Sequence, residues 1–168
     1  MIVILAGVSG SGKTAVGTIM AARLGWAFED SDALHSAADI AKMRSGVPLT
    51  DADRWPWLEA VAAWMDQRAA AGGSAVVACS ALKRSYRDFL RRNRPAVEIV
   101  LLEVDRATLM ARLTARRGHF FPARLLQSQL ADLEPLTPAE PAAMVVPATG
   151  TPADTATEII ARLGLAPG

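Results

Sequence analysis

Near its start the chain reads Gly7-Val8-Ser9-Gly10-Ser11-Gly12-Lys13-Thr14. This segment matches the phosphate-binding pattern G-x-x-x-x-G-K-[ST] at every position. An apolar run, residues 2–6, leads into it, and apolar residues at helical spacing follow it at Val16, Ile19, Met20 and Leu24. A buried strand, a glycine-rich turn and an amphipathic helix are the context that the pattern needs. The sequence therefore predicts a nucleoside triphosphate site at residues 7–14.

The residue types of this segment explain the prediction. Glycines allow the loop to turn its backbone N–H groups inward, which makes an anion site at the N-terminus of a helix. In such a loop Lys13 reaches the β- and γ-phosphates, and the Thr14 hydroxyl is placed to bind Mg²⁺. We therefore expect the whole segment to hold the triphosphate and Thr14 to bind the metal as well.

The same glycines allow two other interpretations. Gly10-x-Gly12-x-x-Ala15 also resembles a dinucleotide-binding fingerprint, with acidic residues about twenty positions further on. That fingerprint should begin where the strand ends, whereas Gly10 comes three residues after Gly7, and it gives Lys13 no role. The second alternative is a glycine-rich turn that binds no ligand. The motif and its context together favour the triphosphate site over both.

Composition narrows the class of protein. The chain has 168 residues, of which 51% are hydrophobic and 21% charged, as in a globular domain. A formal net charge of +1 gives no indication of nucleic-acid or membrane binding, and no apolar run approaches the roughly 20 residues of a membrane span. Cys79 is the single cysteine, which excludes an internal disulfide and suits a reducing compartment. With a strand directly after Met1 we expect no cleavable signal peptide and a cytoplasmic protein.

Strands alternate with helices along the whole chain. This alternation predicts an α/β fold with a parallel sheet covered on both sides and no second domain. We expect Pro56 to open a long helix, and Thr151 with Asp154 to form a capping box at the start of the last one. The expected strands are residues 2–6, 26–28, 74–79, 97–104 and 143–146; the other expected helices are 16–24, 33–45, 82–92, 107–116 and 123–133.

Acidic residues follow the second expected strand. Ligands in open parallel sheets lie at the carboxyl ends of the strands, which puts Asp30, Asp32 and Ser80 along the same edge as the phosphate loop. The third strand ends in Ser80 and lacks the metal-holding Asp that many phosphate-loop enzymes have there. That absence favours a metal-side role for Asp30 or Asp32, although spacing alone fits helix-capping acids equally well.

Several cations and both histidines are weaker candidates. Arg112 and Arg116 lie on one helix face before Gly118, as in a lid that neutralises charge during phosphoryl transfer, but a solvated basic face has the same pattern. Lys83 and Arg87 share another helix face. They fit either an RNA-binding surface or, because Arg binds carboxylates with two hydrogen bonds, a site for a small acid. Lone histidines are more often structural than catalytic.

Further segments give the chain a family resemblance. With the phosphate loop they occur in order over about residues 2–134: Leu34-His35, Lys42-Met43, Gly46-x-Pro48-Leu49-x-Asp51-x-Asp53-Arg54-x-Pro56-Trp57-Leu58, Cys79-Ser-Ala-Leu-Lys83-x-x-Tyr86-Arg87-Asp88, Arg116-x-Gly118-His119-Phe120-Phe121 and Leu125-Leu126-x-Ser128-Gln129. In these the sequence resembles the bacterial-type gluconate kinases (gluconokinases), relatives of shikimate kinase among the nucleoside monophosphate kinase-like P-loop kinases.

The resemblance implies a reaction and a fold. The reaction is ATP-dependent phosphorylation of the 6-hydroxyl of D-gluconate, with Mg²⁺, to give 6-phosphogluconate. The fold is a single three-layer P-loop kinase domain over residues 1–168, with a five-stranded parallel sheet in the order 2-3-1-4-5. A mobile lid at about residues 117–123 and a substrate-binding region at about 33–58 belong to this expectation, and so does a homodimer.

The resemblance also implies residue roles. Asp32 would orient or deprotonate the acceptor hydroxyl, and Asp30 would support the hydration shell of Mg²⁺. Arg112 would pack on adenine, and Arg116 would meet the phosphates when the lid closes. The implied gluconate contacts are Asp32, Arg54, Lys83 and Arg87, with His35 and His119 as second-tier candidates.

This chain departs from the family pattern near the acceptor loop. Ser31 stands where the family usually has Gly, Ser36 where it has Pro, and Asp39 where it has Asn. These changes concern the shape of the acceptor loop and the strictness of gluconate specificity. The alternatives are therefore a related kinase for another aldonate or shikimate and, from a different class, a nucleotide-binding regulatory protein without turnover.

Overall fold

The computed structural model describes residues 1–115 and 123–166, which form one α/β unit. Its strands are β1 (Ile2–Ala6), β2 (Ala27–Asp30), β3 (Ala75–Ala78), β4 (Val97–Glu103) and β5 (Ala143–Pro147). Its α-helices are α1 (Lys13–Leu24), α2 (Ala37–Arg44), α3 (Asp51–Ala70), α4 (Arg84–Arg91), α5 (Arg106–Ala115), α6 (Ala123–Asp132) and α7 (Pro152–Arg162). A short 3₁₀ helix, η1 (Ser31–Leu34), follows β2.

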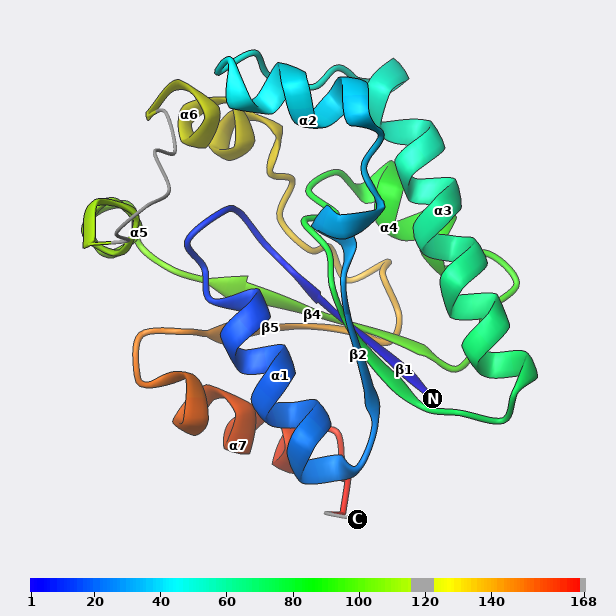
Figure 1. Ribbon diagram of the computed structural model, residues 1–168. Coiled ribbons are helices and arrows are strands. Elements are labelled where there is room, and N and C mark those ends of the chain that lie inside the picture. The colour runs from blue at the N-terminus through cyan, green and yellow to red at the C-terminus, as the bar shows by residue number, and fades with distance from the viewer. Residues whose placement is uncertain (116–122, 167–168) are drawn as a thin grey trace.

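The sheet has the predicted topology. Its five strands lie in the order β2-β3-β1-β4-β5, and every neighbouring pair is parallel. Helices α1 and α7 cover one face, and α3 with α4 covers the other (Figure 1). Helices α2 and α6 lie beyond the carboxyl ends of the strands in the same view. The three-layer arrangement with the 2-3-1-4-5 order is confirmed.

The core follows from the alternation of side chains along the central strand. Ile2 and Ile4 of β1 pack with α3 and α4, whereas Val3 and Leu5 pack with α1 and α7. All four are at most 3% exposed, because a parallel strand covered on both faces buries every side chain. The apolar run before the phosphate loop is therefore what anchors that loop at the centre of the sheet.

A third, smaller apolar cluster lies outside the two main layers. It joins Val8 of the phosphate loop to Leu82 before α4, Leu109 of α5 and Leu126 of α6. These contacts hold α5 and α6 against the loop at the carboxyl edge of the sheet. Within the two described ranges, no helix is long and apolar enough to cross a membrane.

The start of α3 differs from the expectation. The sequence pattern predicts that Pro56 opens this helix, but α3 begins at Asp51 and Pro56 lies inside it. Thr50 and Asp53 form a capping box: each side chain binds the backbone N–H of the other residue, at 3.3 and 2.9 Å. This box is the stronger start signal, and the helix tolerates the loss of the one backbone hydrogen bond that Pro56 cannot donate.

The expected helix over residues 33–45 is divided. Its beginning belongs to η1, and α2 starts only at Ala37. Ser36 separates the two as an N-cap, since its hydroxyl accepts the N–H of Asp39 at 3.1 Å. The capping box of Thr151 and Asp154 at the start of α7 is confirmed, with Pro152 in the first turn.

Candidate active site

The phosphate loop connects β1 to α1 as the sequence predicted. Gly7, Gly10 and Gly12 have φ angles of 135°, 84° and 99°, which residues with a Cβ rarely adopt. A Cβ on Gly7 would also lie 3.0 Å from the Leu102 carbonyl oxygen, so the close approach of β4 requires glycine there. The loop ends at the N-terminus of α1, where backbone N–H groups and the helix dipole favour an anion.

The peptide group between Val8 and Ser9 is held on both sides. The Val8 carbonyl accepts Lys13 Nζ at 3.0 Å and the Ser11 N–H at 3.2 Å. The Ser9 N–H donates to Gln129 Oε1 of α6 at 2.7 Å. The lysine of the motif is thus kept at the loop, beside the cleft that Ser9 and Lys13 line.

Asp30 and Asp32 stand at the carboxyl end of β2, next to the start of α1. The Thr14 hydroxyl donates to Asp30 Oδ2 at 2.7 Å, and Asp30 Oδ1 accepts the Asp32 N–H at 3.1 Å. Asp30 therefore also acts as the N-cap of η1, so both interpretations of this acid apply together. A hydroxyl and a carboxylate oxygen this close are the hard ligands that Mg²⁺ prefers, and the pair fits that ion.

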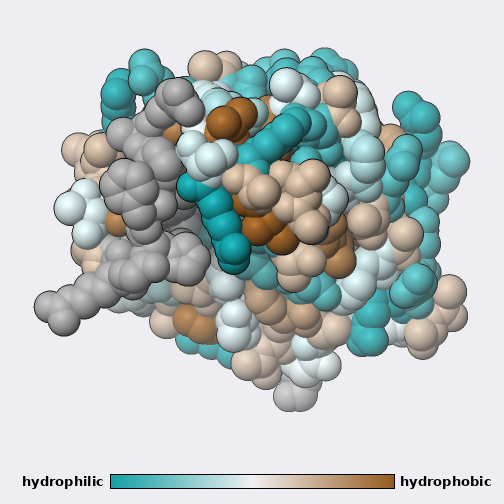
Figure 2. All heavy atoms as spheres, turned by 45° about the horizontal axis from the view of Figure 1, so that its top comes forward, coloured by the Kyte–Doolittle hydropathy of each residue, from teal (hydrophilic) through white to brown (hydrophobic). Residues whose placement is uncertain are grey.

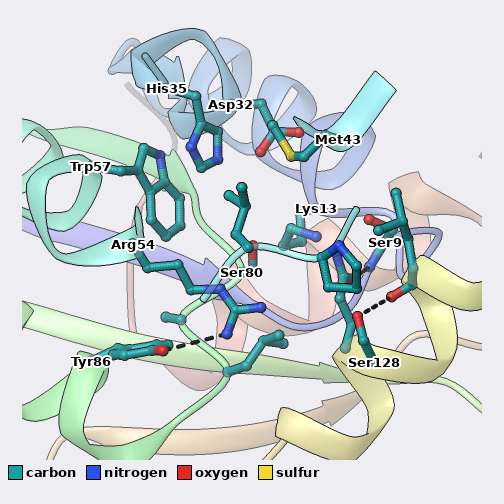
Figure 3. Close-up of a pocket in the computed structure, with 16 residues that line it drawn as sticks. Ser9, Lys13, Asp32, His35, Met43, Arg54, Trp57, Ser80, Tyr86 and Ser128 are labelled. Atoms are coloured by element: carbon teal, nitrogen blue, oxygen red, sulfur yellow. Dashed lines mark hydrogen bonds between the residues drawn. The ribbon is translucent and has the colours of Figure 1, made fainter. Parts of the chain in front are cut away.

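A cleft opens beside Lys13 and is walled by helices on either side. Figure 2 shows hydrophobic side chains in a hollow that hydrophilic ones border, and Figure 3 shows Lys13, Asp32 and Arg54 around a common space. The residues that line it come from the phosphate loop and the start of α1, from η1 and its C-cap, from α2, from the segment before α3, from α3, from the β3–α4 region and from α6: Ser9, Lys13, Asp32, His35, Met43, Pro48, Leu49, Arg54, Trp57, Ser80, Ala81, Leu82, Tyr86, Leu125, Ser128 and Gln129.

Arg54 is the cation of this cleft on the side of α3. Only 8% of the residue is exposed, and its Nη1 donates to Asp132 Oδ2 at 2.7 Å and to the Tyr86 hydroxyl at 3.4 Å. Burial raises the pKa of the Tyr86 hydroxyl, which therefore stays protonated near neutral pH. A guanidinium fixed in this way presents a planar, permanent charge to a small acid in the cleft.

His35 lines the same cleft, next to Trp57 of α3 (Figure 3). Its ring stacks on Trp57 with centroids 4.5 Å apart and planes 8° from parallel, and Nδ1 lies 4.0 Å from Asp39 Oδ2. Burial lowers the pKa of His35 from its ordinary value of 6.5, more than the nearby Asp32 and Asp39 raise it. The imidazole is therefore mainly neutral at pH 7 and offers a hydrogen bond rather than a charge.

Lys83 lies behind the cleft lining. Its Nζ pairs with Asp51 Oδ1 at 2.7 Å and with Asp132 Oδ1 at 3.8 Å, and Asp51 also accepts the Tyr86 hydroxyl. The hydrogen bond from Lys83 lowers the pKa of Asp51. Lys83 is not among the residues that line the cleft, so its described contacts support the Arg54 side of the site from behind.

Arg87 does not line the cleft at all. The residue is fully buried, and its Nε and Nη2 bind the Glu140 carboxylate at 2.7 and 3.1 Å. Its Nη1 donates to the Leu82 and Glu134 carbonyls at 2.9 and 3.1 Å. The expectation that Arg87 contacts gluconate is therefore wrong, because Arg87 is a structural residue that ties α4 to the chain after α6.

Arg112 lies at a second hollow on the other side of the phosphate loop. Its Nη2 donates to the Ala148 carbonyl at 2.7 Å and its Nη1 to the Ser11 carbonyl at 3.4 Å. The hollow is lined by Ser11, Gly12, Val16, Arg112, Ala148, Gly150, Pro152 and Thr155. The guanidinium lies beside the loop, and its packing on adenine stays a prediction. Arg116, His119 and residues 117–122 of the lid expected at about 117–123 lie outside the described residues.

Sequence reasoning assigned no role to several residues of the site. Ser128 and Gln129 belong to a segment that carries the resemblance, yet nothing local indicates that Gln129 reaches Ser9. Asp132 and Trp57 were likewise missed as partners of Arg54 and His35. Ser31, in contrast, is fully buried and away from the cleft lining, and its carbonyl accepts Trp57 Nε1 at 2.7 Å.

Comparisons with known proteins agree on a family. A family model described as an AAA domain matches residues 2–136. A gluconokinase of Gluconobacter oxydans is 52% identical over 131 residues, which are 78% of this chain and 74% of that protein. The crystal structure of an unliganded sugar kinase from Janibacter is 46% identical with a TM-score of 0.92, and covers 99% of this chain and 95% of its own.

A solved structure carries the family name as well. The crystal structure of a gluconokinase from Sinorhizobium meliloti is 42% identical with a TM-score of 0.83, and the match covers 96% of this chain and 91% of that one. The phosphate loop, the acids after β2 and the cleft beside Arg54 lie within residues 2–136, which the family model matches. By sequence and by fold, this chain belongs to the gluconokinase family of P-loop kinases.

Proposed function

We propose that this protein transfers the γ-phosphoryl group of ATP to the 6-hydroxyl of D-gluconate. One observation carries the proposal: Lys13 of the phosphate loop, Asp32 after β2 and Arg54 of α3 line a single cleft. A phosphate donor, a proton acceptor and an anion-binding group are what a kinase for a small hydroxy acid requires. Membership in the gluconokinase family supports gluconate as that acid.

Asp32 is placed to act on the acceptor hydroxyl. The hydrogen bond from its N–H to Asp30 fixes its backbone at the end of β2, and its side chain faces the cleft near Lys13 (Figure 3). Its carboxylate accepts the hydroxyl proton as the oxygen attacks the γ-phosphorus and the bond to the β–γ bridging oxygen breaks. ADP leaves with that oxygen, while Lys13 and the loop N–H groups offset the charge.

Mg²⁺ belongs to the proposal through Thr14 and Asp30. Among the described residues no cluster of three or more His, Cys, Asp or Glu side chains forms a cage for a metal ion. A two-residue site suits Mg²⁺, which binds through one or two protein oxygens together with phosphate oxygens and water. When bound, the ion would neutralise charge on the triphosphate.

The acceptor end of the cleft matches an aldonate in charge and polarity. Arg54 is the group for the carboxylate, because its guanidinium is permanently charged and has further N–H donors besides the one used by Asp132. Hydroxyl and imidazole groups of Ser80, Tyr86 and His35 line the same cleft and suit a chain of hydroxyls. Trp57 and Leu49 supply the apolar wall.

Two alternatives remain as outcomes of the test. Shikimate would need the glycine-rich turn that its kinases have after the third strand, where this chain has Cys79-Ser80. A regulatory protein without turnover has no need of Asp32 facing the cleft beside Lys13. Ser31 is buried away from the cleft, so the departure at this position does not itself widen the acceptor site.

The test is a coupled ADP-release assay across D-gluconate, other aldonates, shikimate and nucleoside monophosphates. We expect the highest kcat/KM with gluconate, and phosphorylation at the 6-hydroxyl by NMR of the product. Turnover of another acceptor without gluconate would contradict the proposed substrate. Nucleotide binding with no turnover of any acceptor would instead favour the regulatory protein.

Location and assembly are part of the same proposal. Cys79 is a free, buried thiol, and burial raises its pKa to about 12, so it is an inert core residue suited to a reducing cytoplasm. The homodimer that the family resemblance implies is checked by analytical ultracentrifugation. Roles for Arg116, His119 and a lid at 117–123 stay predictions, since Arg116 and most of that segment lie outside the described residues.

A further inference from the structure

Helix α6 contacts both the phosphate loop and Arg54, and its residues 125–129 form one of the segments that carry the family resemblance. Its Gln129 accepts the Ser9 N–H of the phosphate loop at 2.7 Å, and its Asp132 accepts Arg54 Nη1 at 2.7 Å. Residues three apart lie on one face of a helix, so the same face of α6 contacts both the phosphate loop and Arg54. We propose that Gln129 is a positioning residue that orients the phosphate loop and, through one peptide group, Lys13.

The argument rests on the geometry of that peptide group. The carbonyl of Val8 and the N–H of Ser9 belong to the same rigid plane. The carbonyl holds Lys13 Nζ at 3.0 Å, and the N–H is held by Gln129 at 2.7 Å. Rotation of the plane would carry both groups away from their partners at once. Gln129 therefore fixes the orientation of the carbonyl that Lys13 uses.

Helix α6 is itself anchored well enough to do this. Leu126 is 2% exposed and packs on Val8, so side-chain packing and the hydrogen bond act on neighbouring residues of the loop. After α6 the Glu134 N–H donates to the Leu82 carbonyl at 2.9 Å, and the Glu134 carboxylate accepts the Arg84 N–H at 2.6 Å. Both ends of the Gln129–Ser9 hydrogen bond are thus carried by fixed backbone.

Loss of the Gln129 oxygen should loosen the loop without unfolding the protein. Without an acceptor, the partly buried N–H of Ser9 would make the present loop conformation less stable. The loop would then sample other peptide orientations before nucleotide binds. The binding of phosphate then includes the cost of ordering the loop. The acceptor side keeps its own contacts, because Arg54 depends on Asp132 and Tyr86 and not on Gln129.

The test compares Gln129→Met with Gln127→Met. Both residues are glutamines of α6, but Gln127 is exposed and does not line the cleft. In the nucleotide-free protein we expect amide exchange of Ser9, measured by NMR, to be about tenfold faster in Gln129→Met and unchanged in Gln127→Met. Gln129→Glu keeps an acceptor oxygen and should retain the slow exchange.

Nucleotide binding and turnover give the functional readout. For Gln129→Met we expect the Kd of ADP, measured by calorimetry, to rise about tenfold and kcat to fall. The KM for gluconate should change less than the Kd of ADP, although Gln129 also lines the cleft, because Arg54 keeps its own contacts. Leu130→Ala is the control for a general loss of α6 packing, because it removes an apolar contact of α6 with the small cluster. There the melting temperature falls and both substrates are affected.

These readouts separate two kinds of failure. The kcat expectation rests on the proposed function, whereas amide exchange and ADP binding need no acceptor. Unchanged exchange at Ser9 and an unchanged Kd of ADP in Gln129→Met would overturn the positioning role even if the parent phosphorylates gluconate. A pattern like that of Leu130→Ala would overturn it too, because Gln129 would then only dock the helix.

Discussion

The donor half and the acceptor half of the cleft are built in different ways. The donor half is one continuous segment, residues 7–14, in which we propose that backbone N–H groups, held by the glycine conformations, bind the phosphates. The acceptor half combines side chains from η1, α3, the β3–α4 region and α6, held by ion pairs behind them. A site made from one backbone segment is determined by the sequence of that segment. A site made from side chains of several elements depends on how all of those elements pack.

The largest effects are expected at two arginines that the sequence could not tell apart. Arg87 supports the fold, whereas Arg54 lines the cleft. Arg87→Met should lower the free energy of unfolding by about 3–5 kcal/mol, because Glu140 stays buried without its partner. Arg54→Met should instead raise the KM for gluconate about tenfold or more, through the loss of a charged hydrogen bond. Urea unfolding and steady-state kinetics on both variants measure the two effects.

A double variant is the control for this pair. Arg87→Met with Glu140→Met replaces the buried ion pair by apolar groups and should recover a large part of the lost stability. A rise in the gluconate KM for Arg87→Met at unchanged stability would mean that Arg87 does contact the acceptor.

Asp32→Asn tests the point where the two halves meet. The amide keeps the shape of the side chain but cannot take the hydroxyl proton, so kcat should fall by at least about 10²-fold. Affinity for ADP, a property of the donor half, should stay within about twofold by calorimetry. A kcat near that of the parent protein would show that another group receives the proton.

A smaller effect is expected on stability at acid pH, and it concerns the Arg87–Glu140 pair that ties α4 to the chain after α6. The hydrogen bond from Arg87 lowers the pKa of Glu140 below its ordinary value of 4.5. A lowered carboxyl pKa contributes stability that is complete above pH 4.5 and is lost as pH falls through the lower folded value. We expect Glu140→Gln to flatten the fall of the melting temperature below pH 4.5.

The matched control for this titration is Glu158→Gln. Glu158 forms an exposed pair with Arg162 on α7, where solvent screens the charges. Below pH 4.5 the melting temperature of Glu158→Gln should fall as steeply as that of the parent protein. If the melting temperature falls with pH equally steeply in Glu140→Gln and in the parent protein, Glu140 does not cause the loss of stability at acid pH.

The smallest expected effect compares two capping boxes. Thr50→Ala and Thr151→Ala should each cost about 1 kcal/mol of stability, since each removes one N-cap hydrogen bond. Only Thr50 begins the helix that carries Arg54, so only Thr50→Ala should also raise the gluconate KM, by a few-fold at most. Equal KM values in the two variants would show that the start of α3 does not position the acceptor.

The sequence predicted those features that depend on neighbouring residues. The phosphate loop, the alternation of strands and helices, and the acids after β2 are each specified within a few positions. The start of α3 shows how two local signals compete: the Thr50 box prevailed over Pro56 because it satisfies N–H groups that would otherwise lack partners. The order of the strands came from the family resemblance, and the structure has the same order.

Only the tertiary structure distinguished Arg54 from Arg87. Both are arginines on amphipathic helices, and each occurs in a segment typical of the family. Which one faces the cleft depends on where Glu140 and Asp132 lie, 53 and 78 residues away along the chain. The pairing of Gln129 with Ser9 spans 120 residues and has no local signal either. A backbone loop is determined by its own sequence, but a side chain acquires its role from partners that folding brings to it.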